Sequence, residues 1–287
     1  MESVSIAEAL GFARERLAGS DSPRADADIL LAHVLGRPRS YLLAWPEREL
    51  TPEQWVVFRV LVERRARGEP VAYLTGSREF FGLEFAVSPA VLIPRPETEL
   101  LVQAALERLP EGPCRVADLG TGSGAIALAI AHERPGAQVV GVDVSPQALA
   151  VARANAERLG LANVSLRAGN WCQGLGEERF DMIVSNPPYI READPHLGQG
   201  DVRFEPAMAL ASGADGLDAV RAIIACVPTH LLPGGWLLFE HGYDQAEEVA
   251  ELMQEAGFVG VESLRDLLGH GRVTLGRLPA AMRPPLP

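Results

Sequence analysis

The sequence contains no lysine, because all 26 of its basic residues are arginine. A Schiff base to a substrate, the phosphate-binding lysine of a Walker motif and a lysine general base all require the missing side chain. The enzyme classes that depend on such a lysine are therefore excluded.

Cysteine and histidine are also scarce. The three cysteines, Cys114, Cys172 and Cys226, are odd in number and show no CxxC spacing. This pattern fits a reducing cytoplasm better than a disulfide framework or a zinc site. The six histidines, among them His33 and His241, show no ligand spacing and are better explained as structural residues. We therefore expect no metal ion in the protein.

A long hydrophobic run is missing as well. No apolar stretch approaches the roughly 18 residues that cross a bilayer, and the start, MESVSIAEALGFARERL, carries acids and lacks a signal-peptide core. We expect a cytoplasmic protein without a membrane partner. Its 287 residues, 47% of them hydrophobic, can bury at least one full core and favour two domains.

Basic residues are fewer than acidic residues. The chain has 26 basic and 38 acidic residues, a net charge of -12, whereas a free-standing nucleic-acid binder is usually basic. The imbalance is concentrated in residues 96–287, where 14 arginines face 25 acids. The composition therefore disfavours direct binding of nucleic acid.

Hydrophobic spacing and breaks divide the chain into parts. Residues 1–75 repeat apolar side chains at helical spacing, which predicts a small helical bundle. Residues 76–95 contain short β-like runs around a glycine, which predicts a hairpin connector. Strands alternate with helices over residues 96–278, which predicts an α/β domain with a doubly wound parallel sheet. Residues 279–287 are expected to form a loose tail.

A glycine-rich loop lies between a predicted strand and a predicted helix. Gly120, Gly122 and Gly124 alternate with Thr121 and Ser123, and glycines let a backbone turn sharply and approach a ligand closely. The loop also satisfies the G-x-G-x-x-A spacing of dinucleotide-binding folds. Alone it indicates only a nucleotide-like ligand.

An acidic residue at the end of the next strand narrows this ligand to a nucleoside cofactor. The Asp143 carboxylate can accept both hydrogen bonds of a ribose diol. Alternatively, the glycines only make a turn and Asp143 caps the helix expected at Pro146, although Ser145 could supply that cap alone. Asp118, two residues before the first glycine, resembles the acid in the first motif of class I S-adenosylmethionine methyltransferases.

The tetrapeptide Asn186-Pro187-Pro188-Tyr189 follows an apolar strand, at the sheet edge where open α/β folds bind ligands. Each proline restricts its own φ and the residue before it. The Asn186 side-chain oxygen and the Pro187 carbonyl can hold the two N–H groups of a planar nitrogen and direct its lone pair at a sulfonium methyl. Tyr189 offers an aromatic face to the planar group. The alternative is an ordinary rigid turn.

These two motifs together resemble methyltransferases that act on planar nitrogen, of glutamine-amide and adenine-amino types. The resemblance extends over nearly the whole chain and narrows to the bacterial release factor glutamine methyltransferases. It is carried by residues 22–51, 70–102, 170–171, 203–220 and 237–242. The family implies a helical N-terminal domain, a hairpin linker and a Rossmann-like class I methyltransferase domain.

The resemblance also implies the roles of the site. The loop from Gly120 to Gly124, with Asp143, Trp171 and Asn186, would contact S-adenosyl-L-methionine, whose product is S-adenosyl-L-homocysteine. Residues 186–189 would hold the glutamine of the Gly-Gly-Gln motif in class I peptide chain release factors. Because every candidate contact lies at or beyond Gly120 and a single amide offers little binding energy, we further expect residues 1–75 to recognise that protein. For Trp171, the alternative to adenine stacking is partly buried packing.

Three other functions compete with this interpretation. An adenine-N6 methyltransferase acting on DNA or RNA would use the same tetrapeptide, but it needs a basic channel for phosphates. A nicotinamide oxidoreductase, or a non-catalytic module with the same fold, leaves the tetrapeptide unexplained.

Overall fold

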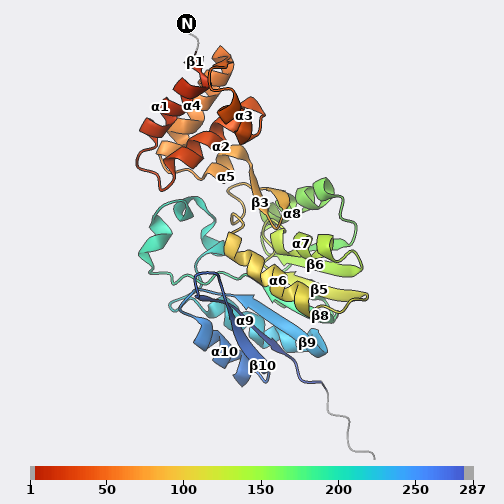
Figure 1. The fold of residues 1–287 in the computed structure, drawn as a ribbon. Coiled ribbons are helices and arrows are strands. Elements are labelled where there is room, and N and C mark those ends of the chain that lie inside the picture. The colour runs from red at the N-terminus through yellow and green to blue at the C-terminus, as the bar shows by residue number, and fades with distance from the viewer. Residues whose placement is uncertain (1–3, 281–287) are drawn as a thin grey trace, which may run out of the picture. The chain divides into compact units, whose positions relative to one another are not determined.

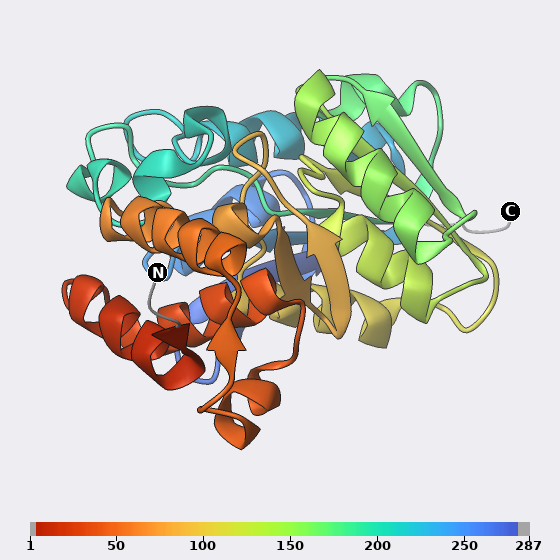
Figure 2. The same ribbon diagram turned by 90° about the horizontal axis from the view of Figure 1, so that it is seen from above.

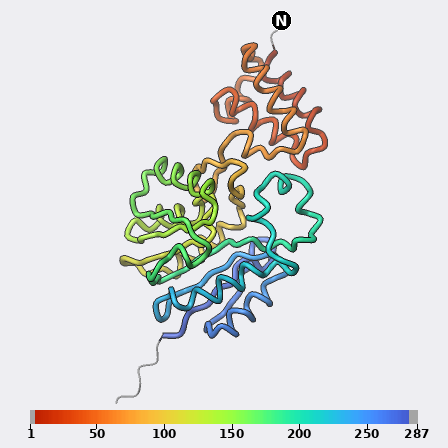
Figure 3. The backbone as a smooth tube through the Cα atoms, turned by 180° about the vertical axis from the view of Figure 1, so that it is seen from behind, coloured from red at the N-terminus to blue at the C-terminus, as the bar shows by residue number. Residues whose placement is uncertain are grey.

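The computed structural model describes residues 4–280, so most of the tail expected at 279–287 lies outside the described residues. The chain forms two compact units. Unit 1 contains Met1–Ser77 and Gln199–Phe204, and unit 2 contains Arg78–Gly198 and Glu205–Pro287. The chain therefore passes between the units after Ser77, after Gly198 and after Phe204, as Figure 3 traces.

Unit 1 is a helical bundle with one short strand pair (Figure 1). Its helices are α1 (Ile6–Arg16), α2 (Pro23–Leu35), α3 (Arg39–Ala44), α4 (Pro52–Ala66) and α5 (Val71–Thr75). Strand β1 (Val4–Ser5) pairs antiparallel with β2 (Glu49–Leu50). Thr51 caps α4 by accepting from the Gln54 N–H at 3.2 Å, and Gln54 Oε1 accepts in return from the Thr51 N–H at 2.9 Å. Buried Leu30 and Phe58 lie in its core.

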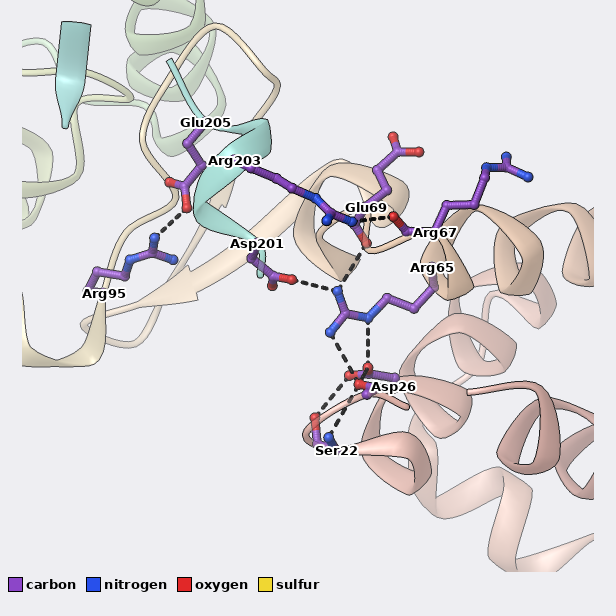
Figure 4. Close-up of polar contacts among 10 residues, drawn as sticks. Ser22, Asp26, Arg65, Arg67, Glu69, Arg95, Asp201, Arg203 and Glu205 are labelled. Carbon is purple, nitrogen blue, oxygen red and sulfur yellow. Dashed lines mark hydrogen bonds and ion pairs between the residues drawn. The ribbon is translucent and has the colours of Figure 1, made fainter. Parts of the chain in front are cut away.

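A buried arginine fastens the segment 199–204 to this bundle. Arg65 donates to Asp26 Oδ2 at 2.7 Å and to Asp201 Oδ1 at 2.6 Å (Figure 4). Arg203 donates to the Arg67 carbonyl oxygen at 2.5 Å. Gly68 has φ of +94°, which favours glycine, and a Cβ there would lie 2.2 Å from the Arg203 guanidinium, so this side chain would have to move. Six residues from the long loop after strand β8 (Phe180–Ser185) thus belong to the bundle.

Unit 2 has a hairpin near its start, which Figure 2 shows from above together with helix α8 (Pro146–Leu159). Strands β3 (Ser77–Phe80) and β4 (Leu83–Ala86) pair with each other. The buried side chain of Asn155 in α8 accepts from the Ala86 N–H at 2.7 Å and donates to the Ala86 carbonyl at 3.0 Å. Asn155 also donates to the Ser123 carbonyl at 2.9 Å. One side chain therefore joins the hairpin to the glycine loop.

The central sheet of unit 2 has the order β10-β11-β9-β8-β5-β6-β7. Its strands are β5 (Cys114–Leu119), β6 (Ala137–Asp143), β7 (Val164–Ala168), β8 (Phe180–Ser185), β9 (Leu231–Glu240), β10 (Val259–Arg265) and β11 (Gly271–Arg277). Neighbours from β7 to β9 run parallel, while β11 is antiparallel to β9 and β10. The chain reverses direction across the sheet between β5 and β8, and open α/β sheets bind ligands at such a point. The predicted doubly wound fold is confirmed.

Helices cover both faces of this sheet. They are α6 (Glu99–Arg108), α7 (Ala125–Glu133), α8 (Pro146–Leu159), α9 (Asp218–Cys226) and α10 (Ala246–Glu255). Short 3₁₀ helices lie in the connecting segments: η1 (Pro96–Thr98), η2 (Trp171–Leu175), η3 (Pro195–Gly198), η5 (Ala207–Ala209) and η6 (Val227–Thr229), with η4 (Val202–Phe204) in unit 1. Alternate strand residues enter opposite cores. Met182 and Val184 pack with α6 and α7, whereas Ile183 packs with α9 and α10.

The cysteines depart from the sequence-based expectation. Cys172 and Cys226 form a disulfide with their Cα atoms 6.1 Å apart, and Cys114 is a buried free thiol. The expectation of a chain without a disulfide was therefore wrong. The two residues are 54 positions apart in sequence and meet only because η2 and the end of α9 pack together. Among residues 4–280, no helix has the length and apolar character needed to cross a membrane.

Candidate active site

A cavity of about 240 Å³ opens at the carboxyl ends of β5, β6, β7 and β8. Its wall brings together Gly120, Gly122, Asp143, Trp171, Asn186 and Pro188 of the residues that the sequence singled out. Four neighbouring strands, β5, β6, β7 and β8, supply these residues at or just after their carboxyl ends, because parallel strands end at the same edge of a sheet. Both the glycine loop and the Asn-Pro-Pro-Tyr segment thus face one space.

The glycine loop turns back tightly from the end of β5. The N–H groups of Gly120 and Thr121 both donate to the Val142 carbonyl at 2.9 Å. Gly120 has φ of +78°, and a Cβ there would lie 3.3 Å from the Trp171 ring. Glycine is therefore required both by the backbone conformation and by the adjoining indole.

Other residues of the loop lie behind the cavity wall. Thr121 and Ser123 are buried, and the Thr121 hydroxyl donates to Asp118 Oδ2 at 2.6 Å. Gly124 begins α7 with φ of +84°, and a Cβ there would lie 3.0 Å from Leu128. None of these three is part of the cavity lining, and their contacts fix the shape of the loop.

Asp118 is a fully buried carboxyl beneath this loop. Its Oδ1 atom has no hydrogen-bond partner. Burial raises the pKa of Asp118 to about 7 against the hydrogen bond from Thr121, and the charge of Asp143 adds to the rise. A buried carboxyl with one oxygen unpartnered is costly to a fold and is typical of functional sites.

Asp143 is held by backbone groups on both sides. Its Oδ2 accepts from the Gly122 N–H at 2.8 Å, and its Oδ1 accepts from the Ser145 N–H at 2.9 Å. The hydroxyl of Ser145 accepts from the Ala148 N–H at 3.1 Å and so caps α8. The side chain of Asp143 is not that cap, and each of its oxygens keeps further acceptor capacity toward the cavity.

Trp171 adopts a backbone conformation that is rare for its residue type. Its φ is +49°, in the left-handed region that favours glycine. The residue begins η2, lines the cavity and packs partly against the core beneath α9 and α10. Such strain is typically retained where a side chain must be aimed at a site.

The Asn-Pro-Pro-Tyr segment divides between the cavity and the interior. Asn186 and Pro188 line the cavity, whereas Pro187 is buried and neither Pro187 nor Tyr189 belongs to the lining. Asn186 Nδ2 donates to Thr98 Oγ1 at 3.3 Å. The Tyr189 carbonyl accepts from Gln245 Nε2 at 3.0 Å, and burial raises the pKa of the Tyr189 phenol. The phenol is therefore neutral at physiological pH.

Two further parts of the wall were not among the predicted site residues. Residues 90–92 follow the hairpin, and residues 206, 208 and 209 follow segment 199–204. Buried Glu205 joins these parts, because its Oε2 accepts from the Ile93 N–H at 3.0 Å while its Oε1 pairs with Arg95 (Figure 4). The available signal was the family-like stretch 203–220, which contains Glu205 but does not reveal its partners.

The histidine after β9 has a structural arrangement. His241 is buried, with Nε2 at 2.8 Å from Thr274 Oγ1 and Nδ1 at 2.9 Å from the Gly242 carbonyl. Burial lowers the pKa of its ring. Within residues 4–280, no group of three or more histidine, cysteine, aspartate or glutamate side chains is placed to hold a metal ion.

Comparison with known proteins identifies the family. The model of the PrmC N-terminal domain matches residues 8–76, and that of the methyltransferase small domain matches residues 96–202. The release factor glutamine methyltransferase of Escherichia coli (strain K12) is 52% identical over 262 residues, which are 91% of this chain and 95% of that protein. The chain belongs to the release factor glutamine methyltransferase family.

A second relative supports the same family, and a solved structure supports the fold. The release factor glutamine methyltransferase of Xylella fastidiosa (strain Temecula1 / ATCC 700964) is 55% identical over 89% of this chain and 94% of its own. A solved methyltransferase from Pyrococcus furiosus, 22% identical, shares the fold with a TM-score of 0.54 over 76% of this chain and 98% of its own. The resemblance drawn from the sequence motifs is confirmed.

Proposed function

We propose that this protein transfers a methyl group from S-adenosyl-L-methionine to the side-chain amide nitrogen of the glutamine in the Gly-Gly-Gln motif of class I release factors. The observation that carries the proposal is the placement of Asn186 in the same cavity wall as Gly120 and Asp143. A rigid amide acceptor beside a nucleoside-type loop is what methylation of a planar nitrogen needs. The named activity of the relatives supports the substrate.

The residues of the cavity fit this cofactor. Asp143 presents a carboxylate fixed by two backbone N–H groups and suited to a ribose diol. Gly120 keeps the loop free of side chains, and Trp171 supplies a ring for a base. The cofactor, when bound, supplies a methyl group on a positively charged sulfur. Its product would be S-adenosyl-L-homocysteine, and no metal is required.

The chain's own residues would act by orienting the substrate amide. An amide nitrogen is a poor nucleophile because its lone pair is delocalised into the carbonyl. Two acceptors, Asn186 Oδ1 and the Pro187 carbonyl, would hold its two N–H groups, and Tyr189 would support the plane of the amide. Since Asn186 Nδ2 donates a hydrogen bond to Thr98 Oγ1, the Oδ1 atom of Asn186 remains to accept from the substrate amide. The net reaction replaces one N–H hydrogen by methyl and releases a proton.

The parts of the chain would divide recognition from chemistry. We assign release factor recognition to residues 1–75, a linking role to 76–95 and catalysis to 96–278. A single amide offers little binding energy, so selecting one glutamine requires contacts remote from it. An acidic protein suits a partner that itself binds ribosomal RNA, and action on release factors would place the protein in the cytoplasm without direct contact with nucleic acid or membrane.

The direct test is methyl transfer from labelled S-adenosyl-L-methionine to purified release factor and, separately, to DNA and RNA, followed by mass mapping. We expect label on the Gly-Gly-Gln glutamine. A release factor whose motif glutamine is replaced by alanine is the matched substrate control and should stay unlabelled. Label on adenine, with none on the intact release factor, would overturn the proposal.

The recognition role of residues 1–75 has its own test. A chain starting near residue 76 should keep cofactor affinity but methylate intact release factor much less efficiently, mainly through a higher KM. The control is Asp201→Asn in the full chain, since the truncation also removes the arginine that pairs with Asp201. Equal efficiency of truncated and full chains on intact release factor would contradict the recognition role.

A further inference from the structure

A carboxyl group without an assigned role lies behind the Asn-Pro-Pro-Tyr segment. Glu240 ends β9, beside the end of β8, where Phe239 pairs with Ser185. The residue is only 2% exposed, and its Oε2 atom has no hydrogen-bond partner. A buried acid that is incompletely bonded costs stability. Retaining one at this place needs an explanation other than packing.

The contacts of Glu240 lead to Asn186. The Thr98 hydroxyl and the Asn186 side-chain amide lie close enough to its carboxyl to lower the pKa of Glu240 against the effect of burial. Asn186 Nδ2 also donates to Thr98 Oγ1 at 3.3 Å. Thr98 is buried and begins the turn into α6. The NH₂ group of Asn186 therefore faces two acceptors on the side away from the cavity.

The orientation of this amide decides what Asn186 offers a ligand. A side-chain amide has donors on one side and an acceptor on the other. If the group were flipped, its NH₂ would meet the N–H groups of a substrate amide and its oxygen would meet a carboxylate. Both contacts would be repulsive. Acceptors behind the NH₂ group thus keep Oδ1 available on the cavity side.

We propose, on the basis of the proposed function, that Glu240 is a positioning residue that fixes the Asn186 side chain with Oδ1 toward the substrate amide. Thr98 carries the same constraint through its hydroxyl, which accepts from Asn186 and lies beside the Glu240 carboxyl. Glu240 does not line the cavity and acts only through Asn186. Its contribution is orientation of an acceptor before the substrate arrives.

Burial and the nearby charged groups make the interaction of Glu240 with Asn186 sensitive to pH. Burial raises its pKa to about 7, with Glu97 of η1 adding to the rise and Arg272 of β11 opposing it. Tyr189 is neutral, and burial keeps the neighbouring His241 ring uncharged. Below about pH 7 the carboxyl is protonated and becomes a weaker acceptor for Asn186. Turnover should therefore fall as pH decreases through 7.

The test compares the full-length protein with Glu240→Gln, which keeps size and removes charge and titration. We expect kcat to fall roughly tenfold or more, while KM for release factor and cofactor affinity change less than about twofold. The decline of kcat below pH 7 should disappear. An unchanged kcat with an unchanged pH profile would overturn the proposal, as would a cofactor affinity that falls in parallel with kcat.

A reciprocal exchange separates orientation from packing. In Asn186→Asp the new carboxylate opposes Glu240, and activity should be lost. Combining it with Glu240→Gln restores a donor facing an acceptor, so the double variant should recover at least about fivefold over Asn186→Asp. Absence of recovery would count against the proposal. If Glu240→Gln does not fold, Thr98→Ser and Thr98→Val test the same constraint. Serine keeps the hydroxyl and should retain activity, whereas valine lacks it and should lose activity.

A readout without turnover distinguishes this proposal from the proposed function. With ¹⁵N-labelled asparagine and no substrate, the Asn186 side-chain N–H resonances should titrate near pH 7 in the parent and not in Glu240→Gln. Titration with no methylation of any release factor would leave the positioning role intact and refute only the proposed substrate. Side-chain resonances that are identical and insensitive to pH in both proteins would refute the positioning role.

Discussion

Among the described residues, the one buried acid of unit 1 is fully paired, whereas unit 2 has three buried acids, of which Glu205 is fully paired and two are not. In unit 1, Asp26 accepts from Arg65 at 2.7 Å and from the hydroxyls of Ser20 at 2.6 Å and Ser22 at 3.1 Å. In unit 2, Asp118 and Glu240 each keep one oxygen without a hydrogen-bond partner. Burial raises the pKa of both to about 7. The first acid is fully compensated, and the other two are not.

This difference indicates where buried acids without enough hydrogen-bond partners lower the stability of the fold. Compensated buried charges hold a fold together, whereas uncompensated ones persist where a site needs an acceptor. Asp118 lies under the glycine loop and Glu240 behind Asn186, so both uncompensated acids adjoin the cavity. Unit 1 shows no such acid among its described residues. We therefore expect neutralising the paired Asp26 to lower stability, whereas neutralising the incompletely paired acids beside the cavity should not.

The largest expected effect is on turnover. Asn186→Ala should reduce methyl transfer by at least about 100-fold, because the substrate amide loses an acceptor that orients its lone pair. Cofactor affinity should fall far less, and thermal unfolding should stay close to that of the parent. Single-turnover rates measure this effect. Rates within about twofold of the parent would remove Asn186 from the mechanism.

A large effect on cofactor affinity is expected next. Asp143→Ala should weaken S-adenosyl-L-methionine binding by about 2–4 kcal/mol, because two charge-assisted hydrogen bonds to the ribose would be lost. Calorimetry on the folded variant measures the change. NAD is the control ligand, and neither protein should bind it. An unchanged affinity for S-adenosyl-L-methionine would remove Asp143 from the site.

A comparison of two acid-to-amide changes sharpens the contrast between the units. Asp26→Asn should destabilise unit 1 by about 3 kcal/mol, because Arg65 keeps its charge and loses a buried partner. Asp118→Asn should instead leave stability unchanged or increased at pH 8. Denaturant unfolding of both variants at one pH tests this difference. Equal destabilisation by the two changes would contradict it.

Asp118 also predicts how the free energy of unfolding depends on pH. The folded-state pKa of Asp118 is about 7, above its ordinary value of 3.8. The folded state therefore binds this proton more tightly, and the stabilisation is complete below about pH 4 and is lost as pH rises to 7. The free energy of unfolding lost through Asp118 over this pH range is on the order of 4 kcal/mol. Unfolding of the parent between pH 4 and 8 should show a component of this sign, which Asp118→Asn removes.

The sequence predicted the elements of the fold because each has a local signal. The alternation of strands and helices over residues 96–278 and the glycines of the loop after β5 are visible without tertiary contacts. The residues themselves indicated a ribose contact for Asp143 and an amide acceptor for Asn186, and the family resemblance added the cofactor's identity and the role of Trp171. The structure brings these three to one cavity.

What the sequence could not predict depends on partners far apart in the chain. Glu240 is one acid among 38, and nothing local shows that it meets Thr98 and Asn186. Asp201 lies 136 positions from Arg65, so its membership of unit 1 had no local signal. The Cys172–Cys226 pair likewise has no spacing pattern. Burial and pairing of single polar residues emerge only from the folded arrangement.

The smallest expected effects come from two matched helix caps, one in each unit. Ser145→Ala removes the cap of α8, and Thr51→Ala removes the cap of α4. Each should cost about 1 kcal/mol of unfolding free energy. Ser145 adjoins the cavity, but only its backbone N–H holds Asp143, and alanine keeps that group. Cofactor affinity should therefore remain within about twofold in both variants. If Ser145→Ala weakened cofactor binding as much as Asp143→Ala, the geometry of the α8 terminus rather than the carboxylate would determine affinity at this edge of the cavity.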